Sequence, residues 1–182
     1  GVSITSSPTY TATGLNILQN SALFGAGVYI EQYVLLTNVN ITNNYGDGIF
    51  VQYSSSNQAE NSIIIESNIL GNENGLIYSD QNAFVQASNN YWGDSSGPYH
   101  PSQNPTGLGD SVNAFVNVDP WLTAPNTDAP PIPAQNNTLT GSGNDFISLG
   151  WDASELGDLA GYKVYYDTDE SGYPYENSID VG

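Results

Sequence analysis

The side chains that could carry chemistry in this sequence are few and widely spaced. Asp47 and Glu73 are carboxylates near equivalent turns of neighbouring repeats, so they could approach each other. Two carboxyl groups roughly 6.5–9.5 Å apart are the machinery of an inverting glycosidase. No third acidic residue joins this pair in the same phase of the repeat. We therefore favour the interpretation that both are solvated turn residues.

Two other candidates point to structure more than to chemistry. His100 is the only histidine, and no Ser, Cys or cluster of metal ligands is spaced to work with it, so we expect a structural hydrogen-bonding role. The acidic run DTDESG at 167–172 is similar to a calcium loop, but Ser178 stands where the loop needs its closing glutamate. We expect an exposed hairpin turn there, no catalytic residue and no cofactor, with calcium as the one ion left open.

The composition is strongly acidic. The 182 residues include 19 Asp and Glu and a single basic residue, Lys163, for a net charge of −18. Nucleic acid and anionic lipid are excluded as partners, because both require basic residues. No apolar run approaches the roughly 18 residues of a membrane span, and there is no cysteine. The scarcity of Lys and Arg leaves little for trypsin-like proteases to cut, which suits an extracellular or cell-surface protein.

Asparagine motifs recur at a spacing that predicts a solenoid. The motif is NILQN from Asn16, NITNN from Asn40 and NILGN from Asn68, with a degenerate copy, NYWGD, from Asn90. Successive copies start 24, 28 and 22 residues apart, and such periods are typical of solenoids. Apolar residues alternate with period two, which indicates strands. Stacked coils would place these four asparagines in one ladder of hydrogen-bonded amides.

Two further sets of short apolar segments complete each repeat. Three short strands with turns between them describe one coil of a parallel β-helix, with coils stacked about 4.8 Å apart. The segments are GVYI from Gly27, GIFV from Gly48 and GLIY from Gly75, and then Tyr33–Leu36, Ile63–Ile65 and Ala83–Val85.

This pattern resembles the right-handed parallel β-helix repeat proteins, the pectate-lyase-like superfamily in its non-catalytic form. The resemblance covers roughly Gly1 to Leu122 and implies an all-β protein built on a right-handed parallel β-helix. Polysaccharide lyases on this architecture use a basic residue to take a proton. The predicted solenoid contains no Lys or Arg, and this departure removes lyase chemistry from its coils.

The segment 89–122 is rich in glycine and proline and has Trp92 and Trp121 near its two ends. Large aromatic side chains need a surface to bury against, so the segment is unlike a free linker. Its sequence NYWGDSSGP, followed by NPTGLGD and PWL, looks like the final coil and cap of many secreted proteins of this group. We expect it to close the solenoid, whereas the first strand at 1–5 has no cap, so upstream coils or another molecule would cover it.

A second domain is expected after the cap. Residues 123–135, TAPNTDAPPIPAQ, predict a proline-rich linker. In 136–182, the apolar stretches at 146–151 and 161–166 resemble strands B and C of a fibronectin type III domain. Such a sandwich takes about 100 residues, so the resemblance implies a domain about half present. Half a sandwich cannot bury Trp151, Tyr162 and Val164 alone, and the remainder would lie downstream or come from a partner.

The alternation also predicts two apolar strips on the outer surface of the solenoid. Contiguous exposed apolar surface usually marks an interface, unless a neighbouring loop or the second domain covers it. The first strip comprises Tyr29, Phe50 and Ile77, and the second comprises Val34, Leu36, Ile64 and Phe84.

Two functions fit these observations. The first is a non-enzymatic extracellular structural or adhesive protein that self-associates into a homomeric assembly such as a filament. The second is a carbohydrate-binding or glycosidase-like secreted protein that binds a polysaccharide and has its active coils outside this chain. An aromatic platform beside carboxylates would favour the second function, and burial of the strips against another chain would favour the first.

Overall fold

The computed structural model describes residues 1–5, 9–22, 25–53, 59–80, 84–143, 145–154, 156, 159–168 and 173–182. The chain forms two compact units, Gly1–Pro130 (unit 1) and Pro131–Gly182 (unit 2). Strands make up nearly all the regular structure of the described residues, with one 3-10 turn, η1, at Ala59–Asn61.

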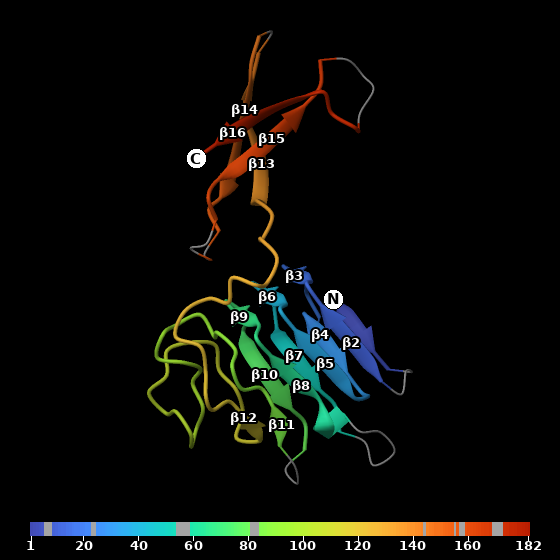
Figure 1. Cartoon of the computed structure of the whole chain (residues 1–182), viewed down its shortest axis with the longest axis vertical. Coiled ribbons are helices and arrows are strands. Elements are labelled where there is room, and N and C mark those ends of the chain that lie inside the picture. Colours follow the sequence, from blue (N-terminus) through green and yellow to red (C-terminus); the bar gives the residue numbers. More distant parts are fainter. Residues whose placement is uncertain are drawn as a thin grey trace. The chain divides into compact units, whose positions relative to one another are not determined.

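Unit 1 contains three β-sheets, and within each sheet parallel strands from successive coils lie side by side (Figure 1). Sheet A has the order β1 (Val2–Ile4), β4 (Val28–Ile30), β7 (Asp47–Val51) and β10 (Asn74–Tyr78). Sheet B has the order β2 (Tyr10–Thr13), β5 (Val34–Thr37), β8 (Ile63–Ile65), β11 (Val85–Gln86) and β12 (Val116–Asn117). Sheet C has the order β3 (Asn16–Leu18), β6 (Asn40–Thr42) and β9 (Asn68–Leu70).

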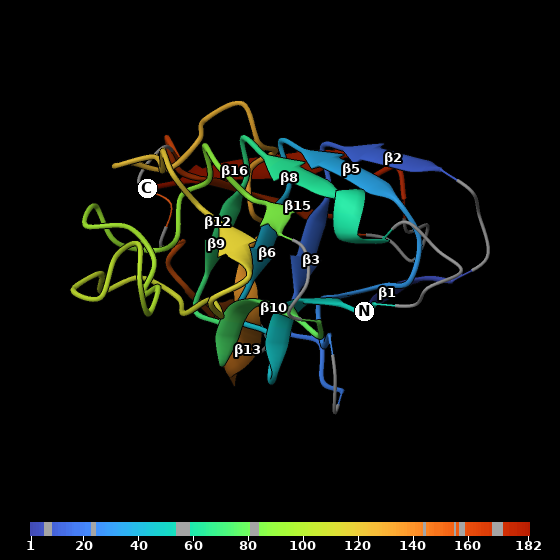
Figure 2. The same cartoon turned by 90° about the horizontal axis from the view of Figure 1, so that it is seen from below.

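The chain visits sheets A, B and C in turn, so each circuit is one coil of a β-solenoid (Figure 2). The stacked parallel strands confirm the all-β architecture that the repeat predicted. Val28 pairs with Ile49 and Ile17 with Ile41, both in parallel register. The inward side chains form one apolar core, in which Ile30, Ile41 and Ile49 are fully buried.

The corner between sheets B and C is a two-residue turn whose first residue has left-handed backbone geometry. These residues have φ between 51° and 65°, and they are Gly14, Asn38 and Glu66. The N–H of Gly14 donates to Asn38 O at 3.1 Å, and the N–H of Asn38 donates to Glu66 O at 3.0 Å. The corner therefore continues the hydrogen-bond ladder from coil to coil, although its residues are not in strands.

A polar ladder inside the solenoid joins the last asparagine of each motif. Asn20 Nδ2 donates to Asn44 Oδ1 at 3.0 Å, and Asn44 Nδ2 donates to Asn72 Oδ1 at 2.8 Å. Asp110 ends the ladder, because its carboxylate accepts from Asn72 Nδ2 and from the backbone N–H groups of Gly71 and Asn72. Asn44 is buried, so this ladder satisfies groups that water cannot reach.

The first asparagines of the motifs form a second ladder on the outer side of sheet C. Asn16, Asn40 and Asn68 are paired in register, and Asn68 Nδ2 donates to Asn40 Oδ1 at 2.8 Å. The segment 123–130 covers them: Asn126 N–H donates to Asn68 Oδ1 at 2.7 Å, and Pro130 O accepts from Asn40 Nδ2 at 2.6 Å. These residues are therefore part of unit 1, and the predicted linker is wrong for this stretch.

Asn90 does not continue this ladder, contrary to the prediction. Asn68 lies opposite Tyr91, one residue further along the chain. The Asn90 amide instead donates to Ile64 O and Ala87 O, and its oxygen accepts from the N–H of Ser67 at 2.9 Å. The fourth copy of the motif is thus shifted by one position and stabilises the last corner of the coil.

The cap packs through both predicted tryptophans. Trp92 is fully buried in the core, and a Cβ on Gly75 would lie 2.8 Å from its ring. Trp121 packs partly buried against the core, and Gly97, with φ of 80°, lies on its indole ring. A side chain on Gly97 would start 2.5 Å from the Trp121 ring, so only glycine permits this contact.

Unit 2 consists of two antiparallel ribbons. The first pairs β13 (Gln135–Ser142) with β14 (Ile147–Asp152), and the second pairs β15 (Tyr162–Tyr166) with β16 (Asn177–Val181). The rings of Trp151 and Tyr162 meet edge to face with centroids 5.4 Å apart, which joins the two ribbons.

Replacing Asn44 with leucine should lower the free energy of unfolding by about 1–3 kcal/mol, because buried partners on Asn20, Asn72 and Ile17 lose their bonds. Urea denaturation followed by circular dichroism measures the change. The control is Asn61→Leu at an exposed site, which should alter stability by less than about 0.5 kcal/mol. Equal changes in the free energy of unfolding for the two substitutions would show that the hydrogen bonds of the inner ladder do not contribute to stability.

Candidate functional site

A shallow hollow of about 560 Å³ lies on the outer side of sheet A. Phe50 and Ile77 provide apolar surface, and Asp47, Glu73 and Asn74 provide polar groups. The structure therefore brings the two sequence-predicted carboxylates to one place. Asp47 Oδ1 accepts from Asn74 Nδ2 at 2.9 Å, so one of its oxygens already has a partner.

The first predicted strip does point outward, beside this hollow. Tyr29, Phe50 and Ile77 are in register and half-buried, with the Tyr29 and Phe50 rings parallel and 5.8 Å apart. Gly25 lies against Tyr29 and Phe50, where a Cβ would come within 3.0 Å, so the chain itself covers part of the strip. Desolvation and a 2.9 Å hydrogen bond to Glu31 raise the pKa of Tyr29.

The second predicted strip is wrong in three of its four members. Val34, Leu36 and Ile64 are fully or almost fully buried and belong to the core. The error arose because VLLT and III are apolar at nearly every position, so alternation does not fix which residues face inward. Only Phe84 is exposed, at 53%, where its ring lies 6.1 Å from that of Phe115.

His100 is a buried structural residue of the cap. Its Nδ1 accepts from the backbone N–H groups of Ser102 at 3.1 Å and Gln103 at 2.9 Å, which leaves Nε2 to donate to Val116 O at 3.0 Å. The ring is therefore neutral, with its proton on Nε2. Burial lowers the pKa of His100, because it disfavours the charged imidazolium.

Acidification below about pH 6.5 should destabilise unit 1 through His100, because the unfolded chain binds a proton that the buried ring resists. The contribution is complete above the unfolded pKa and falls by at most about 1.4 kcal/mol per pH unit below it. Melting temperatures measured from pH 7 to 5 should show this slope in the wild type. His100→Gln should lose the slope in that range, and an unchanged slope would assign it to other groups.

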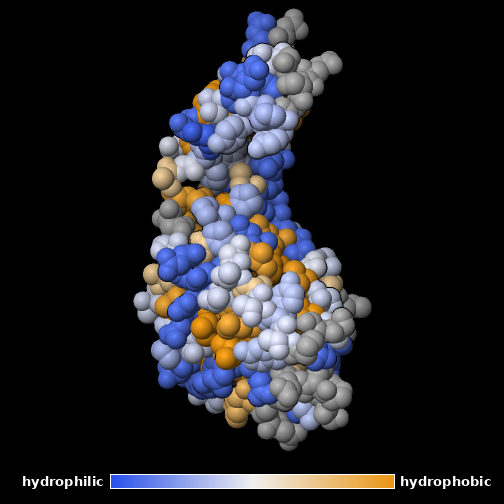
Figure 3. All heavy atoms as spheres, turned by 45° about the vertical axis from the view of Figure 1, so that its right-hand side comes forward, coloured by the Kyte–Doolittle hydropathy of each residue, from blue (hydrophilic) through white to orange (hydrophobic). Residues whose placement is uncertain are grey.

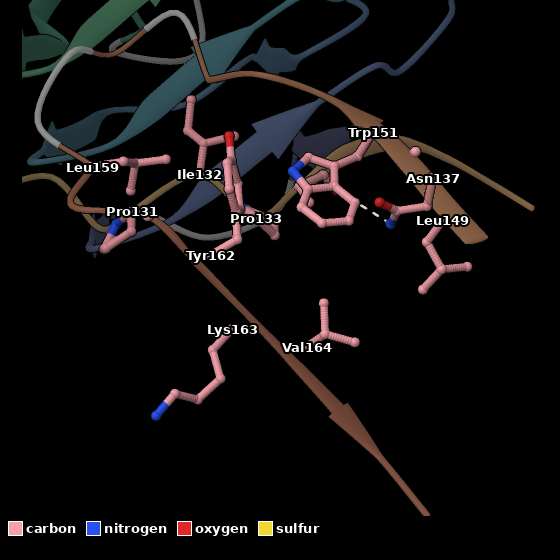
Figure 4. A pocket seen from close by; sticks show the side chains of 13 residues that line it. Pro131, Ile132, Pro133, Asn137, Leu149, Trp151, Leu159, Tyr162, Lys163 and Val164 are labelled. Atoms are coloured by element: carbon pink, nitrogen blue, oxygen red, sulfur yellow. Dashed lines mark hydrogen bonds between the residues drawn. The ribbon is translucent and has the colours of Figure 1, made fainter. Parts of the chain in front are cut away.

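An apolar hollow of about 530 Å³ lies between the ribbons of unit 2 (Figure 4). Ile132 and Tyr162 lie together on one side, and Trp151 and Leu149 extend from β14. Val164 also lines the hollow, whereas the Lys163 side chain points away from it (Figure 4). The sequence identified Trp151, Tyr162 and Val164 as lacking cover, and all three line the hollow together with the exposed Leu149 and the buried Ile132.

Lys163 is the one charged residue among those that line this hollow. Lys163 Nζ is 3.1 Å from Asp180 Oδ1 on the second ribbon, with both side chains exposed. This contact and the local charge raise the pKa of Lys163, but solvent leaves such a pair little net effect on stability. The hollow can therefore hold apolar groups. Lys163 and Tyr162 are the titratable residues among those that line it, and the Lys163 ammonium is paired with Asp180.

The described residues show no group of three or more His, Cys, Asp or Glu side chains placed to hold a metal ion. Most of the predicted acidic loop, at 169–172, lies outside the described residues, as does Ala83 of the third segment set. Within the described part of the chain, no helix has the length and hydrophobicity required to cross a membrane.

Comparison with protein-family models, with curated proteins and with solved structures found no match for this chain.

Proposed function

We propose that this chain is a non-enzymatic structural or adhesive protein of the cell exterior that associates with other copies of itself. One observation carries the proposal: unit 2 exposes apolar side chains that a folded domain normally buries. Ile147 is 73% exposed, Leu139 65% and Ile179 54%. Exposed apolar surface of this kind is typical of an interface.

The fold that we propose for the two units agrees with this function. Unit 1 is proposed to be a right-handed parallel β-helix of the pectate-lyase-like type, used as a stable support. Unit 2 is proposed to be part of a fibronectin type III-like sandwich, a common type of cell-surface module. Figure 3 shows that apolar side chains also lie in separate patches among hydrophilic ones on one face of the molecule. A rigid β-helix joined to a module with exposed apolar surface suits an adhesive or filament-forming protein.

Self-association should depend on concentration and salt. A net charge of −18 opposes contact between copies, and salt screens charges separated by more than a Debye length of roughly 8–10 Å. Sedimentation velocity should therefore show a larger associated fraction at 0.5 M than at 0.02 M sodium chloride, and calcium should act at lower concentration. A single monomer peak at high protein concentration in every buffer would contradict the proposal.

Binding of a carbohydrate is the second candidate, because Phe50 lies with Asp47, Glu73 and Asn74 in the hollow on sheet A. An aromatic ring beside carboxylate and amide groups can contact both the apolar and the hydroxyl-bearing sides of a sugar. The parallel rings of Tyr29 and Phe50 lie against each other, however, which leaves less ring surface for a ligand. This observation places the carbohydrate proposal second.

Purified protein should release neither reducing nor unsaturated sugar from pectin, alginate or related polymers. The proposed absence of catalysis follows from the lack of any Lys or Arg in unit 1 and from the partnered state of Asp47. A reducing-sugar assay and absorbance at 235 nm, the band of unsaturated uronates, measure the two products. Product that disappears in Asp47→Asn and Glu73→Gln but persists in Asp128→Asn would establish an enzyme in this hollow.

A further inference from the structure

The two ribbons of unit 2 each have one apolar and one polar face. On β14, Leu149 and Trp151 alternate with Ser148 and Gly150. On the second ribbon, Val164 lies opposite Ile179, whereas Lys163 lies opposite Asp180. The apolar side chains of the two ribbons constitute the inner face of unit 2. They are Leu139, Ile147, Leu149 and Trp151 on the first ribbon and Tyr162, Val164, Ile179 and Val181 on the second.

The inner face is only partly covered by the described residues of its own unit. Trp151 and Tyr162 meet and are half-buried, but Leu149 remains 50% exposed and Ile147 73%. A ribbon of two strands is at best marginally stable in water and needs further strands or a packing partner. The inner face therefore lacks a second apolar layer that would pack against it and cover these side chains.

Charge favours the inner face as the place where copies meet. None of its eight side chains is charged, although the chain carries a net charge of −18. Lys163 and Asp180 form their ion pair on the opposite face of the second ribbon. A contact through the inner face therefore brings apolar groups together and leaves charged groups in solvent.

We propose that the inner face of unit 2 packs against the inner face of a second copy, so that two units close one shared sandwich. This inference rests on the proposed self-association and names its surface. A contact between identical surfaces is two-fold symmetric, and each ribbon of one copy covers apolar side chains of the other.

The available area is sufficient for such a contact. At the observed exposures, the eight apolar side chains offer on average on the order of 60–100 Å² each, so the inner face supplies roughly 480–800 Å² per copy. A standard interface takes about 800 Å² from each partner. The inner face therefore lies at the lower end of stable interfaces, and the dimer should form reversibly with protein concentration.

Cysteine crosslinking tests the contact directly, because the natural chain has no cysteine. Leu149→Cys and Ile179→Cys lie on the inner face, and Ser148→Cys and Ser178→Cys are their neighbours on the outer face. Mild oxidation of the inner variants, alone and as an equimolar mixture, should give a covalent dimer on non-reducing gels. The outer variants should remain at least tenfold less crosslinked under the same conditions.

Glutamate substitutions at the same positions give an independent readout by sedimentation. Leu149→Glu and Ile179→Glu should weaken dimerisation at least tenfold, whereas Ser148→Glu and Ser178→Glu add the same charge and should change it less than threefold. Both inner residues are half or more exposed in a single copy, so circular dichroism should show unchanged folding. If the inner and the outer glutamate substitutions weaken dimerisation equally, the weakening is caused by net charge and the proposed surface is wrong.

The crosslinking and sedimentation results together distinguish failure of the inner face from failure of the proposed self-association. Self-association that persists in the inner glutamate variants, without crosslinking of the inner cysteines, would overturn the inner face and leave self-association standing. A wild-type protein that stays monomeric, with inner cysteines that never crosslink, would overturn both. That result would follow if other residues of the same chain, or a different protein, cover the inner face.

Discussion

The structure of unit 1 depends on hydrogen bonds between amide side chains of successive coils. A solenoid must turn its chain at every corner, and each turn leaves backbone groups without strand partners. Asn44 meets this need by accepting two N–H donors of Asn20 and donating to Asn72 and to Ile17 O. The core can then be apolar throughout, because asparagines at one corner satisfy the polar groups. The carboxylate of Asp110 completes the row at the cap.

The same chemistry explains which parts of the fold could be predicted from sequence. Asparagines recurring at 24 and 28 residues indicated stacked coils, and the strands lie where that spacing predicted. Each of the first three motifs begins and ends with an asparagine, however, and the pattern alone does not tell which of these two faces inward. The core-facing one is Asn44, whereas Asn40 lies outside under Pro130. The proline-rich composition of 123–130 does not indicate that this segment covers Asn40 and Asn68 of the outer ladder.

Side-chain direction was predictable only where polar residues alternate with apolar ones. In Asp47–Val51 a glycine and an aromatic residue fix the phase, and Phe50 points outward as expected. In Ile63–Ile65 three identical residues leave the phase open, and Ile64 was placed on the wrong face. The hollow on sheet A combines Asp47 and Glu73 from different coils, so it follows from the coil register and from no single motif. The exposed inner face of unit 2 was foreseen at Trp151, because half a sandwich cannot bury a large ring.

The left-handed corner between sheets B and C also limits how the length of a coil can change. That corner consists of two residues in each of three successive coils, Gly14–Leu15, Asn38–Val39 and Glu66–Ser67. An insertion there would break the row of bonds from Gly14 through Asn38 to Glu66. The corner between sheets A and B varies in length, since the chain from Val51 to Ile63 is far longer than that from Ile30 to Val34. Variation during evolution, and loops grafted by design, should therefore accumulate along one edge of the solenoid.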